Sequence, residues 1–338
     1  NISTLIIYTY CDNALRRLRP IYALAVSIFT YLTNTAPIGL WLNLAIFAIR
    51  NTKKISENKH DLRNIEQWGK NATSELWRNQ VEPTEAERCV LDAISVGYRM
   101  IDTAQIYHNE EGVGNAIVKC GVPREELFIV TKVWISNAGE EKAYASILES
   151  LKKLQTVYVD LLLIHQPFGD YYGTYRAMER AYREGKTRAI GVSNFYPDRF
   201  IDIQAHVEVK PAVNQVETHV FNQQITAQEY MEKYGCRIMS WGPFAEGKND
   251  FFNNETLAEI GRKYGKSVAQ VALRYLLQRG VVLIPKSTHK ERMKQNLDIF
   301  NFSLTEEDMT IIRQLDTKQS LFFSHYDPQT VEFYHIAG

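Results

Sequence analysis

Asp102, Lys132 and His165 stand at or just after the ends of three apolar runs that are typical of β-strands. Tyr107 follows the first of these runs, on the predicted loop. A free tyrosine has a pKa of about 10, which is too high for proton transfer at neutral pH, and a neighbouring ammonium lowers that pKa. A carboxylate that pairs with the lysine would hold the ammonium in place. The predicted strands that contain these runs are "YRMIDTA" (98–104), "LFIVTKVW" (127–134) and "VDLLLIHQ" (159–166).

These residue types together indicate a proton-transfer site for a carbonyl or an alcohol. A histidine beside the tyrosine can hydrogen-bond the substrate oxygen, while the phenol gives or takes the proton. Each side chain alone also has an ordinary structural explanation. Asp102 could cap a turn, Lys132 could be a solvated strand end, and His165 could be a core histidine. Their joint occurrence on successive predicted strands favours the catalytic interpretation.

The elements that must position these residues alternate regularly from residue 81 onward. The run at 159–164 is almost entirely apolar, as expected for a parallel strand buried on both faces. Alternating helix and strand patterns predict either a doubly wound sheet or an eight-stranded α/β barrel. Strands are predicted near residues 100, 130, 162, 190, 214, 239 and 284. Helices are predicted over 84–96, 110–119, 140–154, 172–185, 224–234, 255–264, 267–279, 289–299 and 305–315, with a further one that opens with "PDRFIDIQAH" (197–206).

Polar residues at the carboxyl ends of the predicted strands decide between the two folds. In a barrel all these ends converge on one face, where the active sites of such barrels lie, whereas an open sheet spreads them along an edge. Convergence favours a (β/α)8 barrel. Only seven strands are recognisable, so the barrel requires one more strand before residue 84. The polar ends are Asp102, Lys132, His165, Ser193, Asn194, Gln215 and Lys286.

Three long motifs within residues 80–338 resemble those of the aldo-keto reductase family, which folds as a (β/α)8 barrel and uses NADPH. They are "GYRMIDTAQIYHNEEGVGNAI", "VDLLLIHQPFGDYYGTYRAMERAYREGKTRAIGVSNF" and "IPKSTHKERMKQN". The form "HQPFGD" looks most like the bacterial, diketogluconate-reductase-like branch. By this resemblance Tyr107 is the general acid, Lys132 lowers its pKa, Asp102 pairs with Lys132, and His165 orients the carbonyl. The implied activity is NADPH-dependent reduction of an aldehyde or ketone.

The resemblance also implies where the cofactor and the substrate bind. Two cations, Lys286 and Arg292, suit the dense charge of a 2′-phosphate, which an arginine can bind through two hydrogen bonds. NADPH is therefore expected over NADH. The residues expected around the nicotinamide are Ser193, Asn194, Gln215 and Trp241, and those around the 2′-phosphate and adenine are Lys286, Ser287, Arg292, Gln295 and Asn296. Trp134, Phe195 and the stretch "SLFFSHYDP" (320–328) are expected to line the substrate pocket.

Residues 1–80 do not match the family and form a separate N-terminal segment. Two apolar runs, at 21–32 and 38–49, are each shorter than the roughly 20 residues that span a bilayer as a helix. They could form a membrane anchor, a helical hairpin packed on the body, or sequence that is not native to the protein, and residues 51–80 suit a polar linker. We expect membrane contact only if this apolar segment is real, and otherwise a cytoplasmic protein.

The first barrel strand is where the resemblance breaks. The family carries a glycine-rich stretch at its end, but residues 71–83, "NATSELWRNQVEP", contain no glycine. Either "SELWRNQ" supplies an atypical strand, or the first strand is missing and the barrel is compromised. A missing first strand leaves open a cofactor-binding barrel with impaired or no catalysis. A separate alternative is a lyase or aldolase that uses Lys132 as a Schiff base.

Composition excludes several other classes of function. Lysine plus arginine and aspartate plus glutamate balance at 39 each, which removes the electrostatic argument for a nucleic-acid partner. The four cysteines are widely spread without a C-x-x-C pair, so we expect neither a disulfide framework nor a metal site. The expected partner is a small carbonyl compound, and the expected state is a monomer.

Overall fold

A computed structural model describes residues 74–75 and 83–337 of the chain. All of them belong to one compact unit, Asp61–Gly338. The apolar runs at 21–32 and 38–49 lie outside the described residues, so the predictions of an anchor, a hairpin or a linker stay predictions. No described helix is both long and apolar enough to cross a membrane.

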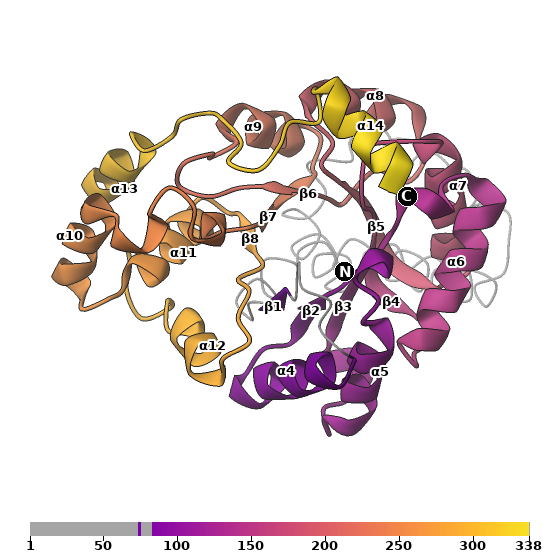
Figure 1. Cartoon of the computed structure of the whole chain (residues 1–338), viewed down its shortest axis with the longest axis horizontal. Coiled ribbons are helices and arrows are strands. Elements are labelled where there is room, and N and C mark those ends of the chain that lie inside the picture. Colours follow the sequence, from indigo (N-terminus) through magenta and orange to yellow (C-terminus); the bar gives the residue numbers. More distant parts are fainter. Residues whose placement is uncertain (1–73, 76–82, 338) are drawn as a thin grey trace, which may run out of the picture. The chain divides into compact units, whose positions relative to one another are not determined.

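Eight parallel strands form one sheet, and each strand pairs with the next one along the chain. The sheet curls, with helices along its outer side (Figure 1). The predicted (β/α)8 fold and all seven predicted strand positions are confirmed. The strands are β1 (Ser74–Glu75), β2 (Met100–Asp102), β3 (Phe128–Val133), β4 (Val159–Ile164), β5 (Thr187–Ser193), β6 (Val213–Glu217), β7 (Arg237–Trp241) and β8 (Val282–Leu283).

The helices begin where the sequence carries recognisable start signals. Pro197 opens α8, and Ser267 and Thr305 form capping boxes at the starts of α11 and α13. The last helix, α14, was not predicted. The helices are α4 (Pro83–Val96), α5 (Glu110–Lys119), α6 (Glu140–Lys153), α7 (Tyr171–Arg183), α8 (Pro197–His206), α9 (Ile225–Lys233), α10 (Glu255–Tyr264), α11 (Val268–Gln278), α12 (Lys290–Leu297), α13 (Glu306–Arg313) and α14 (Pro328–Ala337).

The first strand of the sheet is short and unusual. β1 contains only Ser74 and Glu75, which pair in parallel with Ile101 and Asp102 of β2. These two residues belong to the stretch "SELWRNQ". Of the two alternatives for the first strand, this pairing favours the atypical strand.

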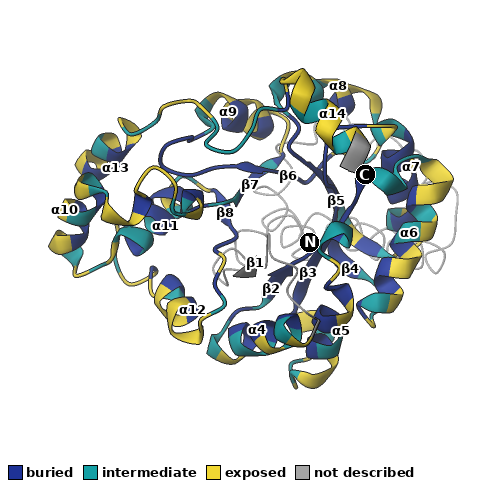
Figure 2. Cartoon of the chain, viewed as in Figure 1, coloured by how far each residue is buried: buried dark blue, intermediate teal, exposed yellow. Residues whose placement is uncertain are grey.

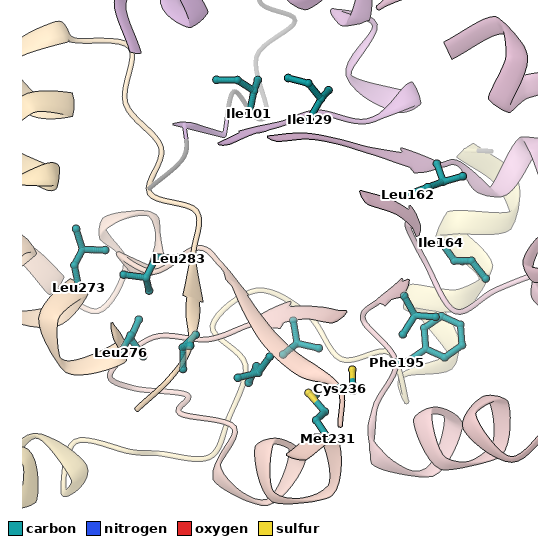
Figure 3. Packing of buried hydrophobic residues seen from close by; sticks show 14 of the residues in the cluster. Ile101, Ile129, Leu162, Ile164, Phe195, Met231, Cys236, Leu273, Leu276 and Leu283 are labelled. Carbon is teal, nitrogen blue, oxygen red and sulfur yellow. The ribbon is translucent and has the colours of Figure 1, made fainter. Parts of the chain in front are cut away.

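The strands bury side chains on both faces, as the apolar run of β4 predicts. An outer cluster joins the strands to the surrounding helices, and Figure 3 shows Ile101, Ile129 and Leu162 from neighbouring strands among its members, with Leu273 and Leu276 from α11. A second, inner cluster consists of Met100, Phe128, Val130, Leu161, Leu163, Ala212, Val213, Met239, Val282 and Ile284. Strands β2 to β8 are mostly buried, while the helices expose one side to solvent (Figure 2).

Candidate active site

The polar residues at the ends of β2, β3 and β4 lie on the same face of the sheet as the inner cluster. Side chains alternate between faces along a strand, so residues two positions apart share a face. Each of the three polar residues follows a member of the inner cluster by two positions. Met100 precedes Asp102, Val130 precedes Lys132, and Leu163 precedes His165. The inner cluster therefore forms the floor beneath the predicted catalytic residues.

Lys132 links the predicted catalytic residues. Its side chain is fully buried, and its ammonium donates to the Asp102 carboxylate and, over 3.0 Å, to the backbone oxygen of Thr103. The Tyr107 hydroxyl lies 3.4 Å from the same ammonium, at the end of the short helix Gln105–Tyr107. Gln215 of β6 donates to the second carboxylate oxygen of Asp102 over 2.9 Å. The structure thus brings together the acid, the lysine and the tyrosine as predicted.

Burial controls the protonation states of this group. Desolvation raises the pKa of Asp102, against the opposing effects of the Lys132 ammonium and the Gln215 amide. The pKa of His165 lies well below its usual value of 6.5, because burial, and then the nearby Lys132 ammonium, disfavour the imidazolium. His165 is therefore a neutral imidazole at physiological pH.

Aromatic rings hold the imidazole of His165 in place. The Tyr107 ring meets it edge-on with the ring centroids 5.5 Å apart, and the Trp134 ring meets it at 5.0 Å. The phenol and the imidazole therefore stand side by side. A carbonyl oxygen placed between them could receive a proton from one and a hydrogen bond from the other.

A pocket opens over these side chains. It gathers six of the predicted site residues with five more that were not predicted individually. The predicted ones are Tyr107, His165, Ser193, Asn194, Gln215 and Trp241. The others are Gln166, Glu246, Phe322, Phe323 and Tyr334, of which Phe322 and Phe323 belong to the predicted stretch 320–328.

Asn194 joins β5 to its neighbours at the edge of this pocket. Its backbone is left-handed with φ of 63°, a conformation that asparagine tolerates better than most residues. Its amide nitrogen donates to the backbone oxygen of His165 over 3.1 Å and to the Ser193 hydroxyl over 3.2 Å. Its amide oxygen accepts from the Trp241 indole over 2.8 Å. Residues from three strands are thereby fixed relative to one another.

The second group of predicted cofactor residues lies apart from this pocket. Lys286 and Ser287 follow β8, and Arg292 is on α12. Lys286 and Arg292 are exposed, whereas Ser287 is buried and accepts from the backbone nitrogen of His289. Gln295, exposed, and Asn296, buried, are also on α12. Arg292 makes no ion pair with any described residue, so its charge is available to an anion.

The two aromatic residues predicted to line the pocket have different positions. Trp134 is buried against His165 and also borders a second cleft, beside Gln105 and Ser146. Phe195 is fully buried in the outer cluster, edge-on to Tyr171 of α7 at 5.3 Å between ring centroids. Phe195 is not among the residues that line the pocket over Tyr107, because its ring packs under α7.

Glu217, at the end of β6, anchors the C-terminal wall of the pocket. Its carboxylate accepts from the Ser320 hydroxyl over 2.5 Å and from the Leu321 backbone nitrogen over 2.9 Å. The same hydroxyl accepts from the backbone nitrogens of Phe322 and Phe323, each over 3.0 Å. Sequence reasoning did not find Glu217, although its place at a strand end, two residues after Gln215, was a usable signal.

No group of three or more histidine, cysteine, aspartate or glutamate side chains in the described ranges could hold a metal ion.

The barrel and this arrangement at its strand ends define a class of enzyme. The sequence model of the aldo/keto reductase family matches residues 67–317. The chain belongs to the aldo/keto reductase family and is an oxidoreductase of that family.

Individual relatives agree with this assignment. The chain is 48% identical over 233 residues to a glyoxal reductase of Bacillus subtilis, which covers 69% of this chain and 84% of the relative. An aldo-keto reductase from a deep-sea metagenome library of the Medee basin superposes with a TM-score of 0.72 at 40% identity, covering 76% of this chain and 94% of that one. A Bombyx mori aldo-keto reductase solved in complex with NADP gives a TM-score of 0.70 at 34% identity, and the match covers 74% of this chain and 90% of that one.

Proposed function

We propose that the protein reduces a small aldehyde or ketone to an alcohol with NADPH, and that Tyr107 donates the proton. The observation that carries this proposal is the position of the Lys132 ammonium. It contacts both the Asp102 carboxylate and the Tyr107 hydroxyl beneath a pocket. A cation held at that distance favours the phenolate and so makes the phenol a better acid.

The pocket residues fit the nicotinamide end of the cofactor. Gln215 donates its amide nitrogen to Asp102, which leaves its amide oxygen to accept from a carboxamide. Trp241 lines the pocket and could stack against a planar ring. When bound, NADPH would supply a hydride to the carbonyl carbon. The proposal agrees with the Bombyx mori relative, which was solved with NADP.

The exposed cations after β8 and on α12 fit the other end of NADPH. Lys286 and Arg292 are the charged members of the predicted set, and a 2′-phosphate is the group that distinguishes NADPH from NADH. An arginine that lacks an ion pair with any described residue can bind such a phosphate through two hydrogen bonds. We therefore assign the 2′-phosphate to this pair.

The side chains of the protein then handle the oxygen of the substrate. Neutral His165 can donate a hydrogen bond to the carbonyl oxygen, which orients the carbonyl and stabilises the charge that develops there. Tyr107 gives its proton to the same oxygen, and Lys132 stabilises the phenolate that remains. Asp102 and the Thr103 carbonyl keep the ammonium in position throughout.

The Schiff-base alternative is less well supported. The Lys132 nitrogen is fully buried and engaged with Asp102, Thr103 and Tyr107, so a substrate carbon has no open approach to it. The other alternative, a cofactor-binding barrel without catalysis, is distinguished from the proposal by a measurement of turnover.

The test is the oxidation of NADPH by the full chain in the presence of 4-nitrobenzaldehyde, followed by the loss of NADPH absorbance. We expect turnover with NADPH and at least about 10-fold lower kcat/KM with NADH, because one lost charged contact is worth about 1.5–3 kcal/mol. Tight NADPH binding without turnover of any aldehyde or ketone would instead support the cofactor-binding alternative.

A further inference from the structure

Gln166, the residue after His165, lines the pocket with Tyr107 and His165 and is only 4% exposed. Its amide oxygen accepts two hydrogen bonds, one from the His325 ring nitrogen Nε2 over 2.7 Å and one from the Asn194 amide over 3.2 Å. Its amide nitrogen makes no hydrogen bond to any described residue. The nitrogen is therefore the part of the amide that is left to face the pocket.

The orientation of the Gln166 amide is fixed, through Asn194, by the Trp241 indole, whose N–H can donate a hydrogen bond but cannot accept one. An indole N–H only donates, so the Trp241 ring requires the oxygen of the Asn194 amide to point toward it. The nitrogen of Asn194 then faces the backbone oxygen of His165, which only accepts, and the side chain of Gln166. Two facing donors would repel, so Gln166 must present its oxygen to Asn194. Flipping Gln166 would break this series of contacts.

The C-terminal segment locks the same amide from its other side. Because Gln166 presents an oxygen, His325 must carry its proton on Nε2. The opposite ring nitrogen of His325 lies 3.4 Å from the Tyr196 hydroxyl, which can donate to it. Phe168 stacks on the His325 ring with the centroids 5.6 Å apart. His325 is thus a positioning residue that holds the oxygen of Gln166 and directs its NH₂ group inward.

We propose that the NH₂ group of Gln166 is a specificity determinant that donates a hydrogen bond to a second oxygen of the substrate, near the reacting carbonyl. This rests on the proposed function. The substrate class that satisfies the site is a carbonyl compound with a neighbouring oxygen acceptor, such as a vicinal diketone, a 2-oxoaldehyde or a 2-hydroxyaldehyde. A simple aldehyde or ketone would leave the buried amide without an acceptor, which is unfavourable.

The test compares two ketones that differ by one oxygen, butane-2,3-dione and 3-methylbutan-2-one, with the full chain and with Gln166→Met. Methionine keeps the length of the side chain and removes the donor. We expect Gln166→Met to lower kcat/KM for the diketone about 10-fold more than it lowers kcat/KM for the monoketone, because only the diketone loses a hydrogen bond to the NH₂ group. Comparing each ketone with itself across the two enzymes cancels the intrinsic reactivity of the diketone.

Gln166→Glu is a second variant, which replaces the donor by an acceptor of the same shape. We expect it to lower kcat/KM for the diketone at least as much as Gln166→Met, because two oxygens then face each other. Equal losses on both ketones, or no loss on the diketone, would overturn the assignment of Gln166 and leave the proposed function standing. If no ketone or aldehyde supports the oxidation of NADPH by the unaltered chain, the proposed function itself fails.

Discussion

At the scale of the residue, Lys132 shows how closely the site is specified. A fully buried ammonium is expensive to desolvate unless it is paired and hydrogen-bonded. Here the Asp102 carboxylate and the Thr103 backbone oxygen satisfy it, and the Tyr107 hydroxyl is the third contact. The first two contacts stabilise the lysine in the fold, and the third gives it a role in proton transfer.

His325 leads to a prediction about pH and stability. Burial, and then the nearby Arg199, lower its pKa from 6.5 to about 4. In the unfolded chain His325 takes up a proton as the pH falls through 6.5, whereas in the folded protein it stays neutral until about pH 4. The contribution of neutral His325 to the free energy of unfolding is therefore complete above pH 6.5 and is lost as the pH falls toward 4. Between about pH 7 and pH 5 we expect the free energy of unfolding to fall by about 2 kcal/mol from this residue.

Urea unfolding at the two pH values measures this loss, with His325→Gln as the matched control. Glutamine can still donate to Gln166 but does not titrate, so the variant should lose about 2 kcal/mol less than the unaltered chain over the same interval. Equal pH dependence in the two proteins would show that His325 does not remain neutral in the fold. His165, whose pKa is also lowered by burial, contributes with the same sign in both proteins.

At the scale of the element, the segment between α13 and α14 forms a wall of the pocket, and Glu217 is one of its anchors. Glu217 holds Ser320, and the Ser320 hydroxyl in turn holds the backbone of Phe322 and Phe323. The Phe322 ring meets Trp241 edge-on at 5.1 Å between centroids. Glu217 and Ser320 are not among the residues that line the pocket, so the anchor should affect binding of the substrate more than the chemical step.

Ser320→Ala should therefore raise KM for 4-nitrobenzaldehyde about 5-fold and change kcat by less than about twofold, because hydrogen bonds worth about 1 kcal/mol are lost from the wall. Steady-state kinetics measures both constants. Ser320→Thr keeps the hydroxyl and should behave like the unaltered chain. A fall in kcat at constant KM would contradict this account of the wall.

How far each element could be predicted depends on how local its signal is. Strand ends were predictable because apolar runs end in polar residues, and the resemblance then supplied roles for Asp102, Lys132 and His165. The helix α14 was not predicted, since its sequence has no clear helical period, and Tyr334 contacts Phe168 only after the chain has folded back. The orientation of Gln166 depends on Trp241, far along the sequence, and no local pattern reports it.

Phe195, just after the end of β5, was expected to line the substrate pocket but is buried in the outer cluster instead. It follows Ser193 and Asn194 directly, so proximity in the sequence suggested a place in the pocket. The chain turns at Asn194, however, where the backbone is left-handed with φ of 63°, and the Phe195 ring packs against Tyr171 of α7. Proximity in the sequence therefore identified the correct end of the barrel but not the correct face.

At the scale of the described barrel, function and stability are separated between its two ends. The carboxyl ends of the strands carry the pocket. Near the amino end of β4, the buried Asp160 carboxylate binds Arg124 over 2.8 Å, Arg188 over 2.9 Å and the Ile129 backbone nitrogen over 2.9 Å. In barrels of this kind that end contributes to stability and does not carry the chemistry.

Asp160→Ala should therefore lower the free energy of unfolding by about 3 kcal/mol, because Arg124, Arg188 and the buried Ile129 backbone nitrogen lose the carboxylate that they bind. Urea unfolding measures the loss, and KM for NADPH in the folded variant should be unchanged. Glu140→Ala is the matched control, since it breaks an exposed ion pair with Arg176 and should change the stability by less than about 1 kcal/mol. Equal losses in the two variants would refute the separation.

The central claim is that Tyr107 donates the proton from a site assembled by Lys132, Asp102 and His165. Tyr107→Phe removes one oxygen and keeps the ring against His165. Its kcat/KM for 4-nitrobenzaldehyde, measured beside its affinity for NADPH, tests the claim most directly. The account predicts a loss of kcat/KM of at least about 100-fold with NADPH binding retained. A Tyr107→Phe variant that keeps the full rate would contradict it.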